Sequence, residues 1–330
     1  MNFDRDEFGL RPGNSYPFPT LCNSLKRRRS RTVGFPVCRS LRDLQLNWVD
    51  ISGVVIEHLL SSCPYLEQLS IENSDSLVDL NVTDQSPRLK HLKIVGCPEL
   101  ESIYLSTTSL LSFNYFGQII HISFVNVPNL VKVSVGGKYS DSIISNFAQL
   151  SNYVFRLETL TLHSRLFVQI GEWEEEGSTV HLKFPMLSHL KNLKLIVSAY
   201  DSQSLLAFAP LLKASPSLHS FALELEVYSW LGLTMVEKAP KCPLLCLKEV
   251  EIVGFVGWDI DMEFVTFLIE NAIMLEKIVI DPLVPLEGSR LTEEEVKERK
   301  EFLKTKAIRK RAMRLKSKFS LGDKLVLRNF

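Results

Sequence analysis

The sequence predicts an α/β solenoid, in which successive coils of the chain stack and their short strands form a parallel sheet. Two observations predict this fold. The pattern apolar-x-x-apolar-x-apolar recurs along most of the 330 residues. The recurrence is also nearly regular, with its smallest step from Leu110 to Leu130 and its largest from Leu157 to Leu190. A regular repeat implies stacked units that bury their apolar side chains only against their neighbours.

The copies of the pattern share apolar residues at the first, fourth and sixth positions. Ten copies begin at Leu41, Leu66, Leu89, Leu110, Leu130, Leu157, Leu190, Leu218, Leu247 and Leu275. Leucine-rich repeats have a period of about 20–29 residues and the core L-x-x-L-x-L. In a strand the last two apolar side chains point into the core, and the residue between them points the other way. We therefore expect a leucine-rich-repeat horseshoe with a parallel concave sheet.

The segments between these strands predict a convex side that mixes helix and strand. Helical spacing occurs at 51–62, 204–213 and 262–271,. Secondary strand-like copies occur between the short middle repeats, at 77–82, 100–105 and 119–124. The stretch 102–131, which has no charged residue, is then a run of short strands, because its polar side chains would be costly in a membrane,.

The sequence divides into three expected parts. Residues 1–36 form a flexible basic arm, residues 37–282 form the solenoid, and residues 283–330 form a C-terminal cap and tail. In the cap, Thr292 and Glu295 make a capping box that predicts a helix through about Arg314, and 325–327 predicts a last short strand,. A capping role is expected because the last repeat of a solenoid exposes its core.

The composition excludes several classes of function. Lys+Arg and Asp+Glu both count 38, so no overall charge attracts the chain to nucleic acid or membrane,. The six cysteines are scattered and no signal peptide is visible, so we expect free thiols and a location in the nucleus or cytoplasm, without secretion,.

No pattern of catalytic or ligand-binding residues stands out, so we expect no enzyme, no cofactor and no metal. Cys242 and Cys246 lie four residues apart, but no second Cys or His pair at ligand spacing accompanies them,. The sequence has neither a phosphate-binding glycine motif nor a nucleophile elbow,.

The expected working surface is the concave sheet. In each copy the residue just before the last apolar position projects from that face. The candidate partner-binding residues at this position are Gln45, Ser70, Lys93, Ser134, Thr161, Lys194 and Glu251. They mix polar, basic and acidic side chains, which favours a protein target over an anion groove.

Three segments resemble the plant F-box/LRR-repeat proteins with a C-terminal FBD-like region. They are 59–67, which resembles that family's helix-to-strand turn, and 247–255 and 271–282, which resemble strands within its FBD-like module, here residues 240–282. The resemblance implies the substrate-binding part of an SCF ubiquitin ligase, whose F-box holds a Skp1-like adaptor. No F-box resemblance precedes Leu41, where prolines and glycines interrupt the chain,. We therefore expect a piece of a longer product or a relative without an F-box, and a Skp1-like adaptor only if an F-box lies upstream.

The basic segments 26–31 and 304–318 provide the alternative, a nuclear or nucleic-acid-associated scaffold,. The second segment has no aromatic residues between its Lys and Arg residues on which nucleobases could stack,. A steep loss of binding to any DNA or RNA with rising salt would favour this alternative.

Overall fold

The structure is a computed structural model, and it describes residues 16–17, 39–84, 87–145, 156–165, 184–200, 202–228, 241–282 and 306–329. The chain divides into two compact units, Met1–Tyr139 and Ser140–Phe330. Each unit is described by itself below, as unit 1 and unit 2.

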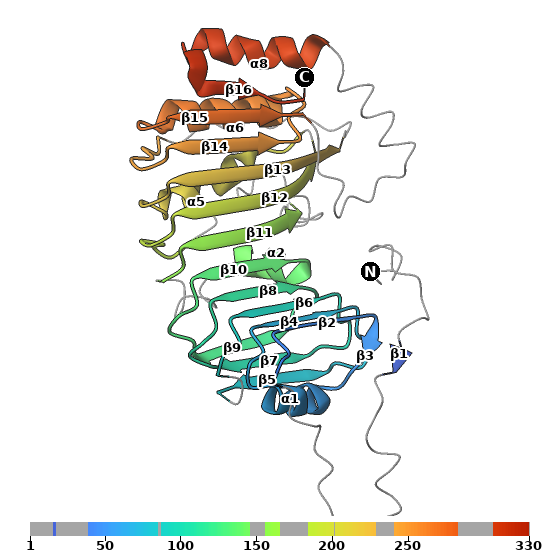
Figure 1. Ribbon diagram of the computed structural model, residues 1–330. Helices are drawn as coiled ribbons and strands as arrows, with labels where there is room; N and C mark the ends of the chain where they lie inside the picture. The colour runs from blue at the N-terminus through green and yellow to red at the C-terminus, as the bar shows by residue number, and fades with distance from the viewer. Residues whose placement is uncertain are drawn as a thin grey trace, which may run out of the picture. The chain divides into compact units, whose positions relative to one another are not determined.

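Unit 1 contains short strands and one helix (Figure 1). In chain order these are β1 (Tyr16–Pro17), β2 (Asp43–Asn47), β3 (Val49–Asp50), α1 (Gly53–Ser62), β4 (Gln68–Glu72), β5 (Asp79–Thr83), β6 (His91–Val95), β7 (Ser102–Ser106), β8 (Ser112–Phe116), β9 (His121–Asn126) and β10 (Lys132–Gly136). Apart from the two-residue strands β1 and β3, the strands are five or six residues long, which follows from the short apolar-x-apolar cores of the repeats,.

The strands of unit 1 form two larger parallel sheets and one small pair. The main sheet has the order β2-β4-β6-β8-β10, and the second sheet has the order β5-β7-β9. The core lies between them, where Phe113 of β8 meets Phe124 of β9 edge to face with ring centroids 5.5 Å apart. The small pair, β1 with β3, was not predicted, because residues 16–17 fall in the segment expected to be a flexible arm.

Each coil must turn sharply after its main strand. The residue directly after the strand has a positive φ in several coils, at Trp48, Asn73, Gly96, Gly137 and Gly254. At Gly96 a side chain would also be blocked, because an added Cβ would lie 2.5 Å from Oδ1 of Asn73. Glycine and asparagine tolerate this left-handed conformation best, and four of these five positions carry one of them,.

Unit 2 has longer strands and more helix. Helix α2 (Lys138–Ser145) begins in the last two residues of unit 1 and continues into unit 2. The other elements of unit 2 are β11 (Thr159–Arg165), β12 (Asn192–Tyr200), the 3₁₀ helix η5 (Leu205–Phe208), α5 (Ala209–Lys213), β13 (Ser220–Tyr228), β14 (Glu249–Val253), α6 (Asp259–Asn271), β15 (Lys277–Asp281), α8 (Lys306–Lys318), the 3₁₀ helix η6 (Gly322–Lys324) and β16 (Leu325–Leu327). The strands from β11 to β16 are parallel neighbours in chain order. Figure 1 shows α5 and α6 together on one side of these strands, with α8 beyond β16.

The structure confirms the leucine-rich-repeat solenoid, because each of the ten copies corresponds to one strand of a parallel sheet. Its apolar pairs face the core, as with Leu69 and Ile71 in β4, which are 2% and 0% exposed. The predicted helical segments correspond to α1, to η5 with α5, and to α6, and the secondary copies correspond to β5, β7 and β9.

The ends of unit 2 contain one element that the sequence did not predict, α2, and one that it did, β16. Helix α2 was not predicted, because its eight residues lack a long apolar period. The predicted last strand is present as β16, and it extends the sheet in register with β15, so the coil after Pro282 still adds a strand. Only the part of the predicted capping helix from Lys306 onward lies within the described residues, and there it continues to Lys318.

The described residues contain no helix that is both long and apolar enough to cross a membrane. The uncharged stretch that raised this question is made of β7, β8 and β9.

Candidate partner-binding face

The open face is the side of each main sheet that carries the residue between the two buried apolar positions of every strand. In unit 1 the register aligns Gln45, Ser70, Lys93, Asn114 and Ser134 in one row across β2, β4, β6, β8 and β10. Four of these residues are predicted candidates. Asn114 of β8 is a further member of the row, which the same offset in the fourth copy would have identified.

In unit 2 the corresponding row is Thr161, Lys194, Ala222, Glu251, Val279 and Val326. The three predicted candidates of this unit therefore lie in one row. Ala222 provides a small side chain between Lys194 and Glu251. Val279 is only 4% exposed although it lies on the open face.

The C-terminal residues explain part of this burial. Nη1 of Arg328 lies 2.7 Å from Oε1 of Glu251, and the backbone N–H of Arg328 donates to the carbonyl of Ile280. Glu251 belongs to β14, so the Arg328 side chain passes over β15, where Val279 lies. Nδ2 of Asn329 also donates to Asp281 over 2.6 Å. Residues 328–329 thus occupy the open face at β14 and β15.

The predicted lysine of unit 1 is held by a neighbouring carboxylate. Nζ of Lys93 lies 2.8 Å from Oε1 of Glu72, and the Ser70 hydroxyl donates to the same oxygen over 3.0 Å. The hydrogen bond from Lys93 is the largest cause that lowers the pKa of Glu72 below its usual value,. Two predicted candidates therefore share one acceptor, which fixes their side chains before any partner arrives.

The open face of unit 2 pairs its charges in the same manner. Nζ of Lys194 lies 2.6 Å from Oε1 of Glu224 on the adjacent strand β13. His163 of β11 lies near this pair, and burial lowers its pKa to about 4, with Glu224 opposing the shift. The imidazole is therefore neutral at physiological pH, so Lys194 and Glu224 dominate the local field.

The two longest strands add aromatic side chains to the open face. In β12 and β13 buried and partly exposed residues alternate along nine positions, ending at Tyr200 and Tyr228. These two residues are register partners, and their rings meet at 6.5 Å between centroids. Neither tyrosine is among the predicted partner-binding residues. The alternation that continues past the repeat core, as in Leu223, Leu225 and Val227, is nevertheless typical of a longer strand,.

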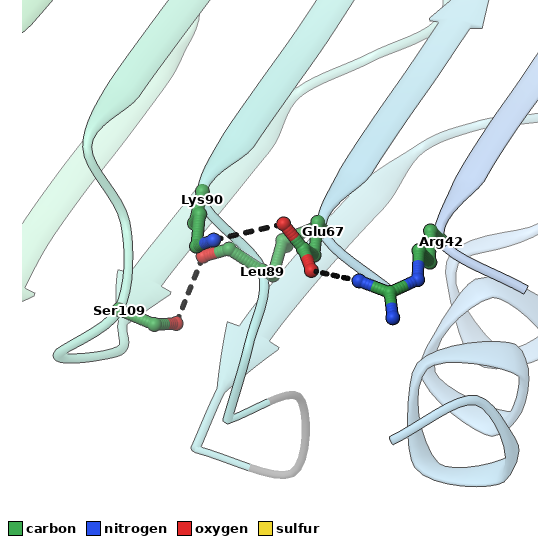
Figure 2. A network of polar contacts seen from close by, with 5 residues as sticks. All are labelled: Arg42, Glu67, Leu89, Lys90 and Ser109. Atoms are coloured by element: carbon green, nitrogen blue, oxygen red, sulfur yellow. Dashed lines mark hydrogen bonds and ion pairs between the residues drawn. The ribbon is translucent and has the colours of Figure 1, made fainter. Parts of the chain in front are cut away.

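A ladder of charges marks the beginning of the first strands of unit 1. Figure 2 shows Arg42 and Lys90 on either side of Glu67. The Arg42 guanidinium lies 3.0 Å from Oε1 of Glu67, and the Lys90 ammonium lies 2.8 Å from Oε2. The hydrogen bond from Lys90 contributes most to a lowered pKa of Glu67. All three side chains follow the first leucine of a repeat, so the ladder favours the native register of neighbouring coils.

The same ladder continues through a hydroxyl, also visible in Figure 2. Oγ of Ser109 donates to the carbonyl of Leu89 over 2.8 Å. We expect Ser109→Ala to lower the free energy of unfolding by ~1 kcal/mol, because it removes a partly buried hydrogen bond between coils.

Urea unfolding followed by circular dichroism measures this effect. The matched control is Thr108→Ala, whose exposed side chain neighbours the same turn and whose loss should change stability by less than ~0.5 kcal/mol,. Equal stability of the two variants would contradict a role for the Ser109 hydroxyl.

The described His, Cys, Asp and Glu side chains do not gather into a metal site. No group of three or more His, Cys, Asp or Glu side chains among them could hold a metal ion. The described cysteines are free thiols. Burial raises the pKa of Cys97 to about 11, so this thiol is protonated and a poor nucleophile,. Cys22 and Cys38 lie outside the described residues.

Parallel strands stacked in register, buried leucines and an open face of mixed polar residues define a leucine-rich-repeat protein. The family model described as At1g61320/AtMIF1, LRR domain, matches residues 27–314. The chain belongs to this family.

Curated relatives from Arabidopsis thaliana point to the same group. The chain is 24% identical over 280 residues to F-box/FBD/LRR-repeat protein At1g13780, an alignment that covers 75% of this chain and 57% of the relative. It is 26% identical over 262 residues to F-box/FBD/LRR-repeat protein At1g13570, covering 73% and 54%. It is 28% identical over 282 residues to FBD-associated F-box protein At5g38590, covering 78% and 63%. The alignments span little more than half the length of these relatives.

Proposed function

We propose that the chain is a non-catalytic protein-recognition module whose open face holds a protein target. The observation that carries this proposal is the register of the open face, which brings the seven candidate residues into one row within each unit. Polar side chains held in place by neighbours lose little entropy when a partner binds, which favours affinity.

The part of the open face with the strongest expected contribution is at β12 and β13. Tyr200 and Tyr228 lie at the C-terminal end of these strands, Lys194 lies near the beginning of β12, and Glu224 lies in the middle of β13. Tyrosine is enriched among the residues that carry most of the binding energy in protein interfaces. The ion pair beside the tyrosines would supply specificity for a partner with complementary charges.

The biological setting that we propose is a ubiquitin ligase. The relatives are named as F-box proteins with FBD and leucine-rich-repeat regions. In such an assembly the repeats would select the target in the nucleus or cytoplasm, and a Skp1-like adaptor would contact an F-box outside the described repeats. The described residues contribute the recognition part of this proposal.

The test compares two double variants with matched chemistry. Tyr200→Ala with Tyr228→Ala removes the aromatic pair of the open face. Tyr65→Ala with Tyr104→Ala removes two tyrosines that lie on a turn and on the second sheet, each 37% exposed. Tagged wild-type chain and both variants are expressed in plant cells, and the proteins that co-purify with each are quantified by mass spectrometry.

We expect a set of proteins that is lost with the open-face variant and retained with the control. For the purified protein with the strongest difference, the open-face variant should raise the dissociation constant about tenfold or more, which corresponds to ~1.4 kcal/mol. Titration calorimetry measures this change. Undiminished binding by the open-face variant would contradict the proposed surface.

The ligase setting has its own readout. The half-life of the captured protein should increase when the full-length gene product is depleted, and also when the proteasome is inhibited. An unchanged half-life with intact binding would leave a recognition module and reject the ligase setting.

A further inference from the structure

The surface of α8 carries a strong positive charge that the open face does not use. The helix buries Ile308, Ala312 and Leu315 on one side. Arg311 packs beside the loop before α6, where its Cδ would lie 2.8 Å from a Cβ at Gly257. The apolar side of α8 is therefore committed to unit 2, and its other side faces solvent.

All the charged side chains on the exposed side are basic. The described basic side chains of α8 are Arg309, Lys310, Arg311, Arg314, Lys316 and Lys318. Lys310, Arg314 and Lys318 are spaced by four residues, so they form one stripe along the helix. The helix itself contains no acidic residue.

These charges have no acidic partner among the described residues. None of the ion pairs between described side chains involves a base of α8. Lys318 contacts the ring of Phe319, at 4.6 Å from its centroid, and a ring does not neutralise a charge. Several lysines of the described repeats pair with a Glu of an adjacent coil, as Lys191 does with Glu158 and Lys248 with Glu276.

Like charges at a spacing of four repel one another, so the basic stripe makes the isolated helix less stable. An external anion that contacts several of these bases would remove the repulsion. The contact would add charge-assisted hydrogen bonds, which are stronger than neutral ones. The stripe is thus suited to a partner that carries several negative charges at regular intervals.

The surroundings favour a protein as the source of these charges. The helix cannot insert an apolar face into a lipid interface, because Ile308, Ala312 and Leu315 are buried in the fold,. It carries no aromatic side chain on which a base could stack,. Met313, 43% exposed between the bases, offers an apolar contact that suits a peptide side chain,. We infer that the exposed face of α8 is a second docking surface, which binds a segment of a partner protein rich in Asp or Glu.

The inference is tested with a fluorescein-labelled decaglutamate peptide and the full chain. Fluorescence anisotropy should show saturable binding at about 50 mM salt that is lost at about 500 mM. The charge-reversal variant Lys310→Glu with Arg314→Glu should weaken binding about tenfold or more. The control variant Lys213→Glu with Lys241→Glu changes the net charge equally at two exposed lysines outside α8 and should bind as the wild type does.

Two further arms separate the sources of negative charge. A blunt DNA duplex and phosphatidylserine vesicles replace the peptide at the same salt concentration. Tighter binding to either of them than to decaglutamate would overturn the assignment to a protein segment. Equal loss with the control variant would show that only overall charge matters, and would overturn the site itself. The milder variant Lys310→Gln with Arg314→Gln, checked by thermal melting, gives the same test if charge reversal perturbs folding.

Because the open-face tyrosines take no part in this contact, the Tyr200→Ala with Tyr228→Ala variant should bind decaglutamate normally. The two surfaces can therefore fail independently.

Discussion

Asp261→Ala is expected to lower the free energy of unfolding of unit 2 by ~3–4 kcal/mol, because it leaves buried backbone donors without an acceptor. Asp261 lies in the first turn of α6 and is fully buried. Its Oδ2 accepts hydrogen bonds from the backbone N–H groups of Val256 and Gly257 over 2.6 and 2.7 Å. The carboxyl group therefore holds the loop before α6 in place, and alanine offers no substitute.

Asp261→Asn separates the hydrogen bonds from the charge. Burial raises the pKa of Asp261 to about 7, and the backbone hydrogen bonds oppose the shift,. The pKa of Asp261 is higher in the folded protein than in the unfolded chain, where it is near 4,. The contribution of the Asp261 carboxyl group to stability is therefore full below pH 4 and is lost as the pH rises through 7. Asparagine retains one acceptor oxygen and has no charge to bury.

The asparagine variant should therefore gain stability relative to the wild type as the pH rises from 4 to 8, by on the order of 2–4 kcal/mol. Urea unfolding curves for wild type, Asp261→Ala and Asp261→Asn at several pH values measure the difference. Burial also raises the pKa of Asp141, to about 6, but this residue is common to all three proteins and cancels in the comparison. A pH-independent difference between asparagine and wild type would show that Asp261 is ionised without cost.

The repeat made most of the fold predictable from the sequence. Pleating alone determines which of two adjacent residues is buried, so Leu92 and Ile94 could be assigned to the core and Lys93 to the open face without coordinates,. The same rule placed the seven candidates in rows. The same offset also identifies Asn114 and Ala222, and the register between strands confirms that they lie in these rows.

Other features depend on contacts between residues far apart in the sequence. The Arg328 contact with Glu251 spans 77 positions, and no local pattern marks it. Burial of Asp261 could not be read from its sequence, because an acidic residue in the first turn of a helix is ordinarily solvated there. Helix α2 is too short to show an apolar period, so no local pattern indicates where this helix begins.

The close contact between α1 and β5 leads to the second large expected effect. Alanine usually stabilises a helix relative to glycine by about 1 kcal/mol, so Gly53→Ala would ordinarily raise stability. In unit 1, however, a Cβ at Gly53 would meet the backbone carbonyl of Asp79 in β5, whose carbonyl carbon lies 3.0 Å away. A backbone group cannot rotate aside as a side chain can, so α1 and β5 would have to separate.

We therefore expect Gly53→Ala to lower the free energy of unfolding by ~2–3 kcal/mol, opposite in sign to the helix propensity. Urea unfolding followed by far-ultraviolet circular dichroism measures it in the full chain. The control is Gly322→Ala, where φ is +55° and an added Cβ would have no neighbouring atom within 4 Å. This variant should therefore lose only about 1 kcal/mol, the cost of the left-handed conformation for alanine. If Gly53→Ala were more stable than the wild type, α1 could not lie against β5 as described, and the order of helix and second sheet in unit 1 would be wrong.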